Sequence, residues 1–205
     1  MKKRLGFTII ELMITIAVIG IGLAIGVPAM NQFVLDNRLV SQINTLNSSL
    51  ALARSEAVKQ NEHTVVCVSS DGATCTAGAN WNEGWIVFVD RPEPPDFKIY
   101  NFDYDAGDGT GCSEGSTIDC LLAVEAKVAG SNSLVGGEDV PNYISYRGSG
   151  IARCDADEDK CSREKTYFTL CDQRGAAHAR ALAVSNTGRT SSIKTNPTGG
   201  ALVCP

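Results

Sequence analysis

Residues 7–30 read FTIIELMITIAVIGIGLAIGVPAM, an apolar run interrupted by Thr8, Glu11 and Thr15. A helix rises about 1.5 Å per residue and roughly 20 apolar residues cross a bilayer core, so this run predicts a membrane-spanning helix. It is also longer than the apolar core of an ordinary signal peptide. Residues 1–6, MKKRLG, carry three positive charges and no acid. The positive-inside rule therefore predicts a cytoplasmic start, with the rest of the chain across the membrane.

The rest of the sequence has the composition of an acidic globular protein. The chain has 205 residues, of which 43% are hydrophobic and 20% charged, and its formal net charge is −5. This length allows one domain or two small ones, and this composition excludes disorder throughout. The negative charge excludes a protein whose whole surface binds nucleic acid or anionic lipid, so any such contact must be local.

The eight cysteines indicate structural disulfides in an oxidising compartment. No C-x-x-C motif occurs and only two histidines are present, so no metal is expected. Spacing leaves the connectivity open, and buried free thiols are the alternative. The simplest pairing joins near neighbours and one distant pair: Cys67 with Cys75, Cys112 with Cys120, Cys154 with Cys161, and Cys171 with Cys204.

After Pro28 the sequence becomes amphipathic. Apolar residues recur at steps of three or four, which places them on one face of a helix: Leu39, Ile43, Leu46, Leu50, Ala53 and Ala57. One continuous helix is expected from Phe7 to about Asn61, with a kink or a looser turn at Pro28 because proline lacks an N–H. The apolar stripe is expected to pack on the chain's own β domain, on neighbouring subunits, or on both.

Beyond Glu62 the pattern changes to short β-strands bounded by Gly, Pro, Asn and Asp. Strands are expected at 64–69, 84–90, 98–102, 142–146, 166–170, 180–184 and 190–194, while 121–128 is ambiguous between strand and helix. The predicted fold class is α+β, in which a long N-terminal α-helix packs on a disulfide-tied antiparallel β domain.

The beginning of the chain carries a specific motif. Gly6-Phe7-Thr8 precedes the apolar run, and Glu11 follows Phe7 by four residues. This arrangement resembles the class III leader of type IV pilins and pseudopilins. The resemblance implies that prepilin peptidase cuts after Gly6 and methylates Phe7, so the apolar segment stays on the mature protein. A carboxylate in apolar surroundings needs an opposite charge, which the Phe7 amine of a neighbouring subunit would provide for Glu11. The alternative is that Glu11 lies close enough to the membrane interface for its carboxylate to reach water.

A second resemblance covers the amphipathic helix and the first strands. The segments ARSEAVK (53–59), VVC (65–67) and WNEGWIVFVD (81–90) are similar to the H-type pseudopilin and FimT/FimU minor-pilin family. The implied organisation is a leader at 1–6, a transmembrane half-helix at 7–30, an amphipathic stem at 31–61 and an extracytoplasmic β-rich domain at 62–205.

The same resemblance implies a function in assembly. The expected protein is a minor pilin that primes or caps a type IV pilus, and an H-type pseudopilin of a type II secretion system is the alternative. Its partners would be prepilin peptidase, other minor pilins, the major pilin or pseudopilins, and inner-membrane lipid. It would be a single-pass inner-membrane protein with its globular domain in the periplasm and a fraction in the pilus or pseudopilus.

DNA binding is a further alternative. Residues 163–205 hold six basic and two acidic residues, whereas residues 7–162 hold nine basic and 21 acidic residues. Some FimT-type proteins bind DNA through a Gly-Arg-x-Arg turn, and Gly188-Arg189-Thr190-Ser191 matches only its first two positions. The hypothesis assigns DNA contact to Arg180, Arg189 and Lys194, and we favour the alternative that they form a solvated hairpin tip.

Other chemistries are not supported by the sequence. Neither His63 nor His178 lies in a catalytic motif, so neither an enzyme nor a cofactor is expected. Two acidic clusters lack the complete ligand pattern of a calcium loop and are interpreted as solvated loops. Their members are Asp103, Asp105 and Asp108, and Asp155, Asp157, Glu158 and Asp159. Trp81, Trp85 and Phe88 are interpreted as core residues that pack against the stem rather than as a ligand platform.

Overall fold

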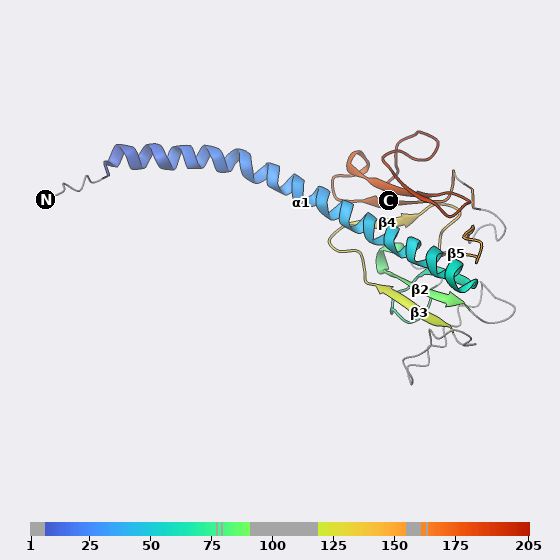
Figure 1. Ribbon diagram of the computed structural model, residues 1–205. Coiled ribbons are helices and arrows are strands. Elements are labelled where there is room, and N and C mark those ends of the chain that lie inside the picture. The colour runs from blue at the N-terminus through green and yellow to red at the C-terminus, as the bar shows by residue number, and fades with distance from the viewer. Residues whose placement is uncertain (1–6, 77, 79, 91–118, 155–160, 163) are drawn as a thin grey trace. The chain divides into compact units, whose positions relative to one another are not determined.

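The computed structural model describes residues 7–76, 78, 80–90, 119–154, 161–162 and 164–205 (Figure 1). These residues form one α-helix, α1 (Ile9–Gln60), and two 3-10 helices, η1 (Trp81–Glu83) and η2 (Ala176–His178). The strands are β1 (His63–Val68), β2 (Trp85–Asp90), β3 (Cys120–Glu125), β4 (Ser133–Gly136), β5 (Tyr143–Tyr146), β6 (Ala152–Cys154), β7 (Tyr167–Cys171), β8 (Arg180–Val184) and β9 (Thr190–Ile193). Gly6, Cys112, the predicted strand 98–102 and both acidic clusters lie outside the described residues.

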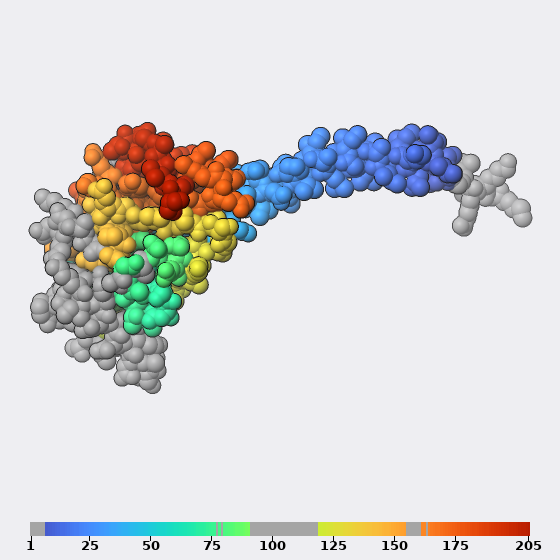
Figure 2. Space-filling view, turned by 180° about the vertical axis from the view of Figure 1, so that it is seen from behind, coloured from blue at the N-terminus to red at the C-terminus, as the bar shows by residue number. Residues whose placement is uncertain are grey.

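The contacts divide the chain into residues 1–38 and residues 39–205, which are described separately. In the first unit, α1 continues through Pro28 without interruption, and a kink there remains a prediction. The large apolar side chains of residues 9–30 are 54–81% exposed, as the blue segment of Figure 2 shows. Among the described residues, α1 is the helix long and apolar enough to cross a membrane.

The second unit contains two antiparallel sheets, which together cover the second half of α1 (Figure 1). One sheet has the strand order β3-β2-β1-β5-β6 and the other the order β4-β7-β8-β9. At the end of α1, Asn61 adopts a φ of 56°, a left-handed conformation that asparagine tolerates and that stops the helix before β1.

The core lies where the apolar stripe of the stem meets both sheets. All six stripe residues predicted from the 3–4 spacing are 0–4% exposed and pack with Val66 and Val87 of one sheet and with Phe168 and Leu182 of the other. The amphipathic pattern is therefore confirmed. The expectation that the same stripe also packs on neighbouring stems is wrong, because these side chains have almost no surface left for another chain.

Most of the predicted strands are confirmed to within about two residues. The ambiguous segment 121–128 contributes the strand β3, whose backbone hydrogen-bonds to β2. The sequence analysis missed β4 and β6, which are only four and three residues long. Strands this short carry too little alternation to be recognised, and the partner of β4, the strand β7, lies more than 30 residues further along the chain.

Among the described residues, three disulfides tie the β domain together: Cys67–Cys75, Cys154–Cys161 and Cys171–Cys204. They are three of the four pairs that the spacing suggests, and the fourth involves Cys112, outside the described residues. The Cys171–Cys204 bond holds the C-terminal segment, so that Leu202 packs with Ala179 and Ala181 beside β8. In Figure 2 this dark red segment lies against the orange surface of the preceding residues.

Candidate functional site

The first candidate site is the start of α1, where Thr8 caps the helix. The Glu11 amide donates a hydrogen bond to the Thr8 hydroxyl at 3.3 Å, and the Leu12 amide donates to the Thr8 carbonyl at 3.2 Å. A threonine that binds the amide three residues on is a standard N-cap. The sequence analysis missed this role, although Thr-x-x-Glu before an apolar run is its sequence signature. The cap leaves Phe7 just outside the helix, where a cut after Gly6 would create the new amine.

Glu11 lies in the first turn of this helix among exposed apolar side chains. Its carboxylate has no hydrogen bond or ion pair with any residue that the structure describes. Phe7 is 78% exposed. The described residues therefore supply neither an apolar cover for this segment nor a charge partner for Glu11, and lipid or another subunit could provide both.

The second candidate site is a hollow of about 670 Å³ beside the last turns of the stem. It is lined from α1 by Ala51, Arg54, Val58 and Lys59 and from the β8–β9 turn by Gly188 and Arg189, with Ser55 and Thr190 completing the lining. We call this site the basic hollow. Arg54 and Lys59 come from the stem and Arg189 from a turn more than 120 residues further along the chain, so no local motif predicts the site.

Close backbone packing fixes one wall of the basic hollow. The Arg54 Nε donates a hydrogen bond to the Gly150 carbonyl at 3.1 Å, which ties the stem to the β5–β6 turn. Gly188 has a φ of 75°, and a Cβ there would lie 3.0 Å from Arg54 Nε and even closer to the Gly150 carbonyl oxygen. Position 188 therefore requires glycine both for its conformation and for its lack of a side chain.

Tyr146 lies behind this wall. Its ring is fully buried, and a Cβ on Gly188 would come within 3.0 Å of its Cε1. Its hydroxyl finds no hydrogen-bond partner among the described residues. Burial raises the pKa of Tyr146, and the nearby positive charge of Arg54 opposes that shift only in part. The neutral hydroxyl of Tyr146 thus lies behind this wall, near the permanent positive charge of Arg54.

The basic residues proposed for DNA contact do not form one patch. The register pairs Ala181 with Ile193 and Val184 with Thr190, so Arg180 and Lys194 stand at one end of the β8–β9 hairpin. Arg189 stands in the turn at the other end. At about 3.3 Å per strand residue, roughly 13 Å separates the two ends. The structure instead places Arg189 with Arg54 and Lys59, two residues that the sequence analysis did not connect with it.

The tryptophans interpreted as core residues are buried against the stem. Trp81 donates its indole N–H to the Val140 carbonyl at 2.9 Å, and its ring meets Phe168 edge-on at 4.8 Å. Trp85 packs in the same cluster. Phe88 corrects the interpretation: it is buried in a second cluster with Val65 and Ile86 on the opposite face of the sheet. Residues three apart on a strand point to opposite faces, so Trp85 and Phe88 cannot both reach the stem.

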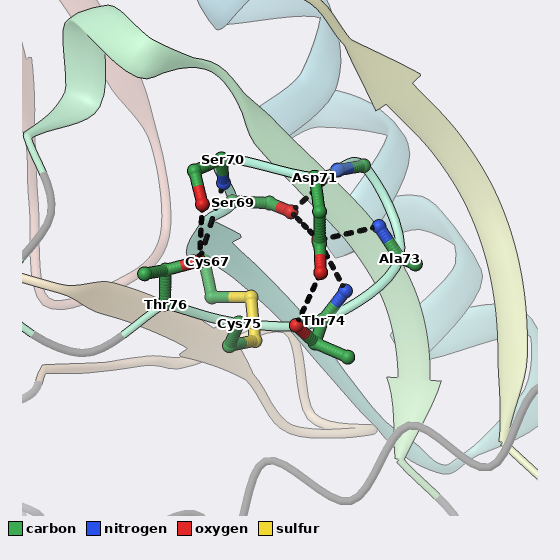
Figure 3. The surroundings of a disulfide bond; sticks show 9 residues. Cys67, Ser69, Ser70, Asp71, Ala73, Thr74, Cys75 and Thr76 are labelled. Atoms are coloured by element: carbon green, nitrogen blue, oxygen red, sulfur yellow. Dashed lines mark hydrogen bonds between the residues drawn. A yellow bond between two sulfur atoms is a disulfide. The ribbon is translucent and has the colours of Figure 1, made fainter.

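A short loop closed by the Cys67–Cys75 disulfide is organised by Asp71 (Figure 3). The Thr74 and Ala73 amides each donate a hydrogen bond to Asp71 Oδ1 at 2.8 Å, and the Thr74 hydroxyl donates to Oδ2 at 2.8 Å. These donors hold the pKa of Asp71 well below its ordinary value. Hydrogen bonds to the Asp71 carboxylate, rather than those of a helix or strand, thus order this loop.

A buried ion pair stands beside the Cys171–Cys204 disulfide. The Arg174 guanidinium approaches Asp172 Oδ2 at 2.6 Å, and the two side chains are 11% and 1% exposed. Burial by itself raises the pKa of Asp172, but the hydrogen bonds and charge of Arg174 outweigh it and leave the pKa below its ordinary value. Asp172 and Arg174 bind each other, so neither is a free group for a ligand.

Two family models match this chain. A model described as "Type II transport protein GspH" matches residues 42–188, and one described as "Prokaryotic N-terminal methylation motif" matches residues 1–27. Together with the uncovered apolar helix and the disulfide-tied β globule, these matches define a type IV pilin-like protein, the class of minor pilins and pseudopilins. Since the first model covers more than half of the chain, the chain belongs to the GspH family. The resemblance seen in the sequence is thus confirmed.

Individual known proteins are also similar to this chain. A "Type IV major fimbrial protein FimA" from Dichelobacter nodosus is 31% identical over 144 residues, which are 64% of this chain and 82% of that protein. Two crystal forms of the type IV minor pilin FimU from Pseudomonas aeruginosa are 18% identical and have TM-scores of 0.49 and 0.46. These alignments cover 83% and 80% of this chain and 96% and 97% of the FimU chains.

Proposed function

We propose that this chain is a minor pilin of a type IV pilus, a structural and non-catalytic subunit. Prepilin peptidase cuts it after Gly6 and methylates Phe7, and other minor pilins then draw it into a complex that primes or caps the pilus. Before assembly it is a single-pass protein of the inner membrane with its globular domain in the periplasm. The similarity to a type IV fimbrial protein and the match to the N-terminal methylation motif support this proposal.

The two halves of α1 differ sharply in the exposure of their apolar side chains, and this difference is the main support for the proposal. Large apolar side chains of residues 9–30 are 54–81% exposed, whereas the apolar stripe of residues 39–57 is 0–4% exposed. The second half of α1 is thus stabilised by its own globule. The first half needs an apolar environment from outside the chain, which lipid provides before assembly and neighbouring helices provide afterwards. A lone carboxylate in that uncovered half favours a protein partner over lipid alone, because lipid tails cannot neutralise it.

The H-type pseudopilin of a type II secretion system is the second candidate. The match over residues 42–188 to the model described as "Type II transport protein GspH" favours it. Deletion of the gene separates the two: loss of surface pili with normal secretion supports the pilus assignment, and loss of secretion with normal pili supports the pseudopilus assignment.

Glu11→Val tests the role in assembly. The variant should insert into the membrane at least as well as the wild type, because an apolar side chain replaces a carboxylate; the gain reaches about 2.5–3.5 kcal/mol only for a carboxylate deep in the span. It should be missing from sheared filaments in an immunoblot, because it no longer offers a charge partner to a neighbouring Phe7 amine. Ile10→Val, an apolar change one residue away, is the control and should assemble normally. Normal incorporation of Glu11→Val would refute the pairing role.

A further inference from the structure

The basic hollow concentrates positive charge on an acidic protein. Without residues 1–6 the chain has 15 basic and 23 acidic side chains. The basic hollow nevertheless brings three cations together, and one of them, Lys59, is paired with Glu56 at 3.2 Å. Arg189 is exposed and has no ion-pair partner among the residues that the structure describes. Among the described residues, the site therefore keeps a local excess of positive charge that no acidic side chain neutralises.

The lining combines this charge with an apolar surface. Ala51 and Val58 lie on the stem between the cations, and Val58 is 52% exposed. Arg54 is only half-buried, and its Nε bond to Gly150 fixes the guanidinium while its terminal nitrogens can still donate. A fixed guanidinium next to a free one is suited to binding carboxylates, because each can donate two parallel N–H bonds to one carboxylate.

We infer that the basic hollow is a docking site for an acidic peptide segment of a partner pilin-like subunit. This inference rests on the proposed function, since it is assembly that brings such a subunit to the stem. The occupant has carboxylates for Arg54 and Arg189 and apolar side chains for Ala51 and Val58. Residues 7–162 of this chain hold 21 acidic against nine basic residues, so a subunit of similar composition offers such segments.

The arrangement favours a peptide over a nucleic acid. A phosphate backbone is followed by cations spaced along a track. Here the two cations that would extend such a track, Arg180 and Lys194, stand at the far end of the β8–β9 hairpin, roughly 13 Å away along the strands. The cations of the basic hollow are instead gathered around a single concave site with apolar side chains between them.

The test uses the full processed chain in a non-ionic detergent. Its probe is a fluorescent peptide of alternating Glu and Val, titrated by anisotropy at about 0.15 M salt, where the Debye length is about 8 Å. Arg189→Gln should weaken binding about 3- to 10-fold, the range for one partly exposed charge-assisted contact, and Arg189→Lys should retain part of it. The double variant Arg54→Gln with Arg189→Gln should weaken binding further.

The matched control removes two positive charges from the same hairpin, whereas Arg189→Gln removes one. The double variant Arg180→Gln with Lys194→Gln should change peptide affinity less than about 2-fold, because those charges lie beyond the Debye length. Equal weakening by this control would show attraction to net charge alone and would overturn the inference. So would absence of peptide binding by the wild type, or tighter binding of a 20-base-pair duplex that Arg189→Gln abolishes. An unchanged melting temperature of Arg189→Gln confirms that the loss is not unfolding.

Failure of this inference is distinguishable from failure of the proposed function. Arg189→Gln leaves the Gly6 cut and the Glu11 pairing untouched, so the peptide can fail to bind while filament incorporation still depends on Glu11. If the wild-type protein itself is absent from sheared filaments, the proposed function fails whatever the peptide does.

Discussion

Trp85 donates its indole N–H to the hydroxyl of Ser49 at 3.0 Å, and both side chains are at most 3% exposed. The Ser49 hydroxyl in turn donates to the Thr45 carbonyl one helical turn back, at 3.2 Å. The bond joins β2 to the stem inside the core. Ser49 lies on the buried face of an amphipathic helix, where its hydroxyl accepts the hydrogen bond that the buried Trp85 indole must donate.

Ser49→Ala should destabilise the fold by about 1–3 kcal/mol, because it leaves a buried indole N–H without an acceptor. Equilibrium unfolding in denaturant, followed by tryptophan fluorescence, measures the change. The control is Ser48→Ala, which removes an exposed hydroxyl from the preceding residue and should change the free energy of unfolding by less than about 0.5 kcal/mol. Equal effects of the two substitutions would contradict a specific role for the Trp85 bond.

Two of the disulfides close loops of very different length and should therefore contribute unequally to the free energy of unfolding. Cys171 and Cys204 are 33 residues apart, whereas Cys154 and Cys161 are seven apart. Chain-entropy theory gives about 3.7 kcal/mol for the longer loop and about 2.4 kcal/mol for the shorter one. Replacing each pair by serines and comparing the unfolding midpoints tests the order. A larger loss for Cys154 and Cys161 would refute it.

Asp71→Asn should make the stability of the protein less dependent on acid pH. The amide donors hold the folded pKa of Asp71 below the unfolded value of about 3.9, so the carboxylate contributes stability that is fully present above that value. That contribution declines as the pH falls below about 4, because the carboxyl is then protonated in the unfolded chain but still ionised in the folded one, and it is gone once the folded carboxylate is protonated too.

The measurement is the difference in melting temperature between Asp71→Asn and the wild type from pH 7 to pH 2. The wild type should be more stable at pH 7, and the difference should shrink below about pH 4. Glu164→Gln, which alters an exposed carboxyl with no amide donors among the described residues, should give a difference that does not follow this course. A constant difference for Asp71→Asn would disprove the role of its ionised form.

Replacing Gly6 by a bulky residue should block processing, because the family cut leaves a glycine at its end. Cells that contain prepilin peptidase should then accumulate a form heavier by residues 1–6. Mass spectrometry of the purified protein distinguishes this form from one that starts at Phe7. A normally trimmed product from the variant would contradict the leader assignment.

Local features of this protein follow from its sequence because they depend on neighbouring residues. Residues 9–30 of the apolar run and the stripe of 39–57 lie within one continuous helix, whose spacing is fixed at 3.6 residues per turn, and Thr8 caps its start. The strands Arg180–Val184 and Trp85–Asp90 are equally local, since β-rich composition and flanking turn residues define them. The leader motif is contiguous, and the family resemblance therefore follows from the amino-acid sequence alone.

What only the tertiary structure decided is which distant residues meet. The sequence grouped Arg189 with Arg180 and Lys194 because all three belong to its basic C-terminal part, but the hairpin register separates them and the stem brings Arg54 and Lys59 to Arg189 instead. It likewise assigned Phe88 to the stem, although the pleat of β2 turns it to the other face. Periodicity states which side chains share a face of one element, whereas the partner of that face depends on the packing of both sheets around the helix.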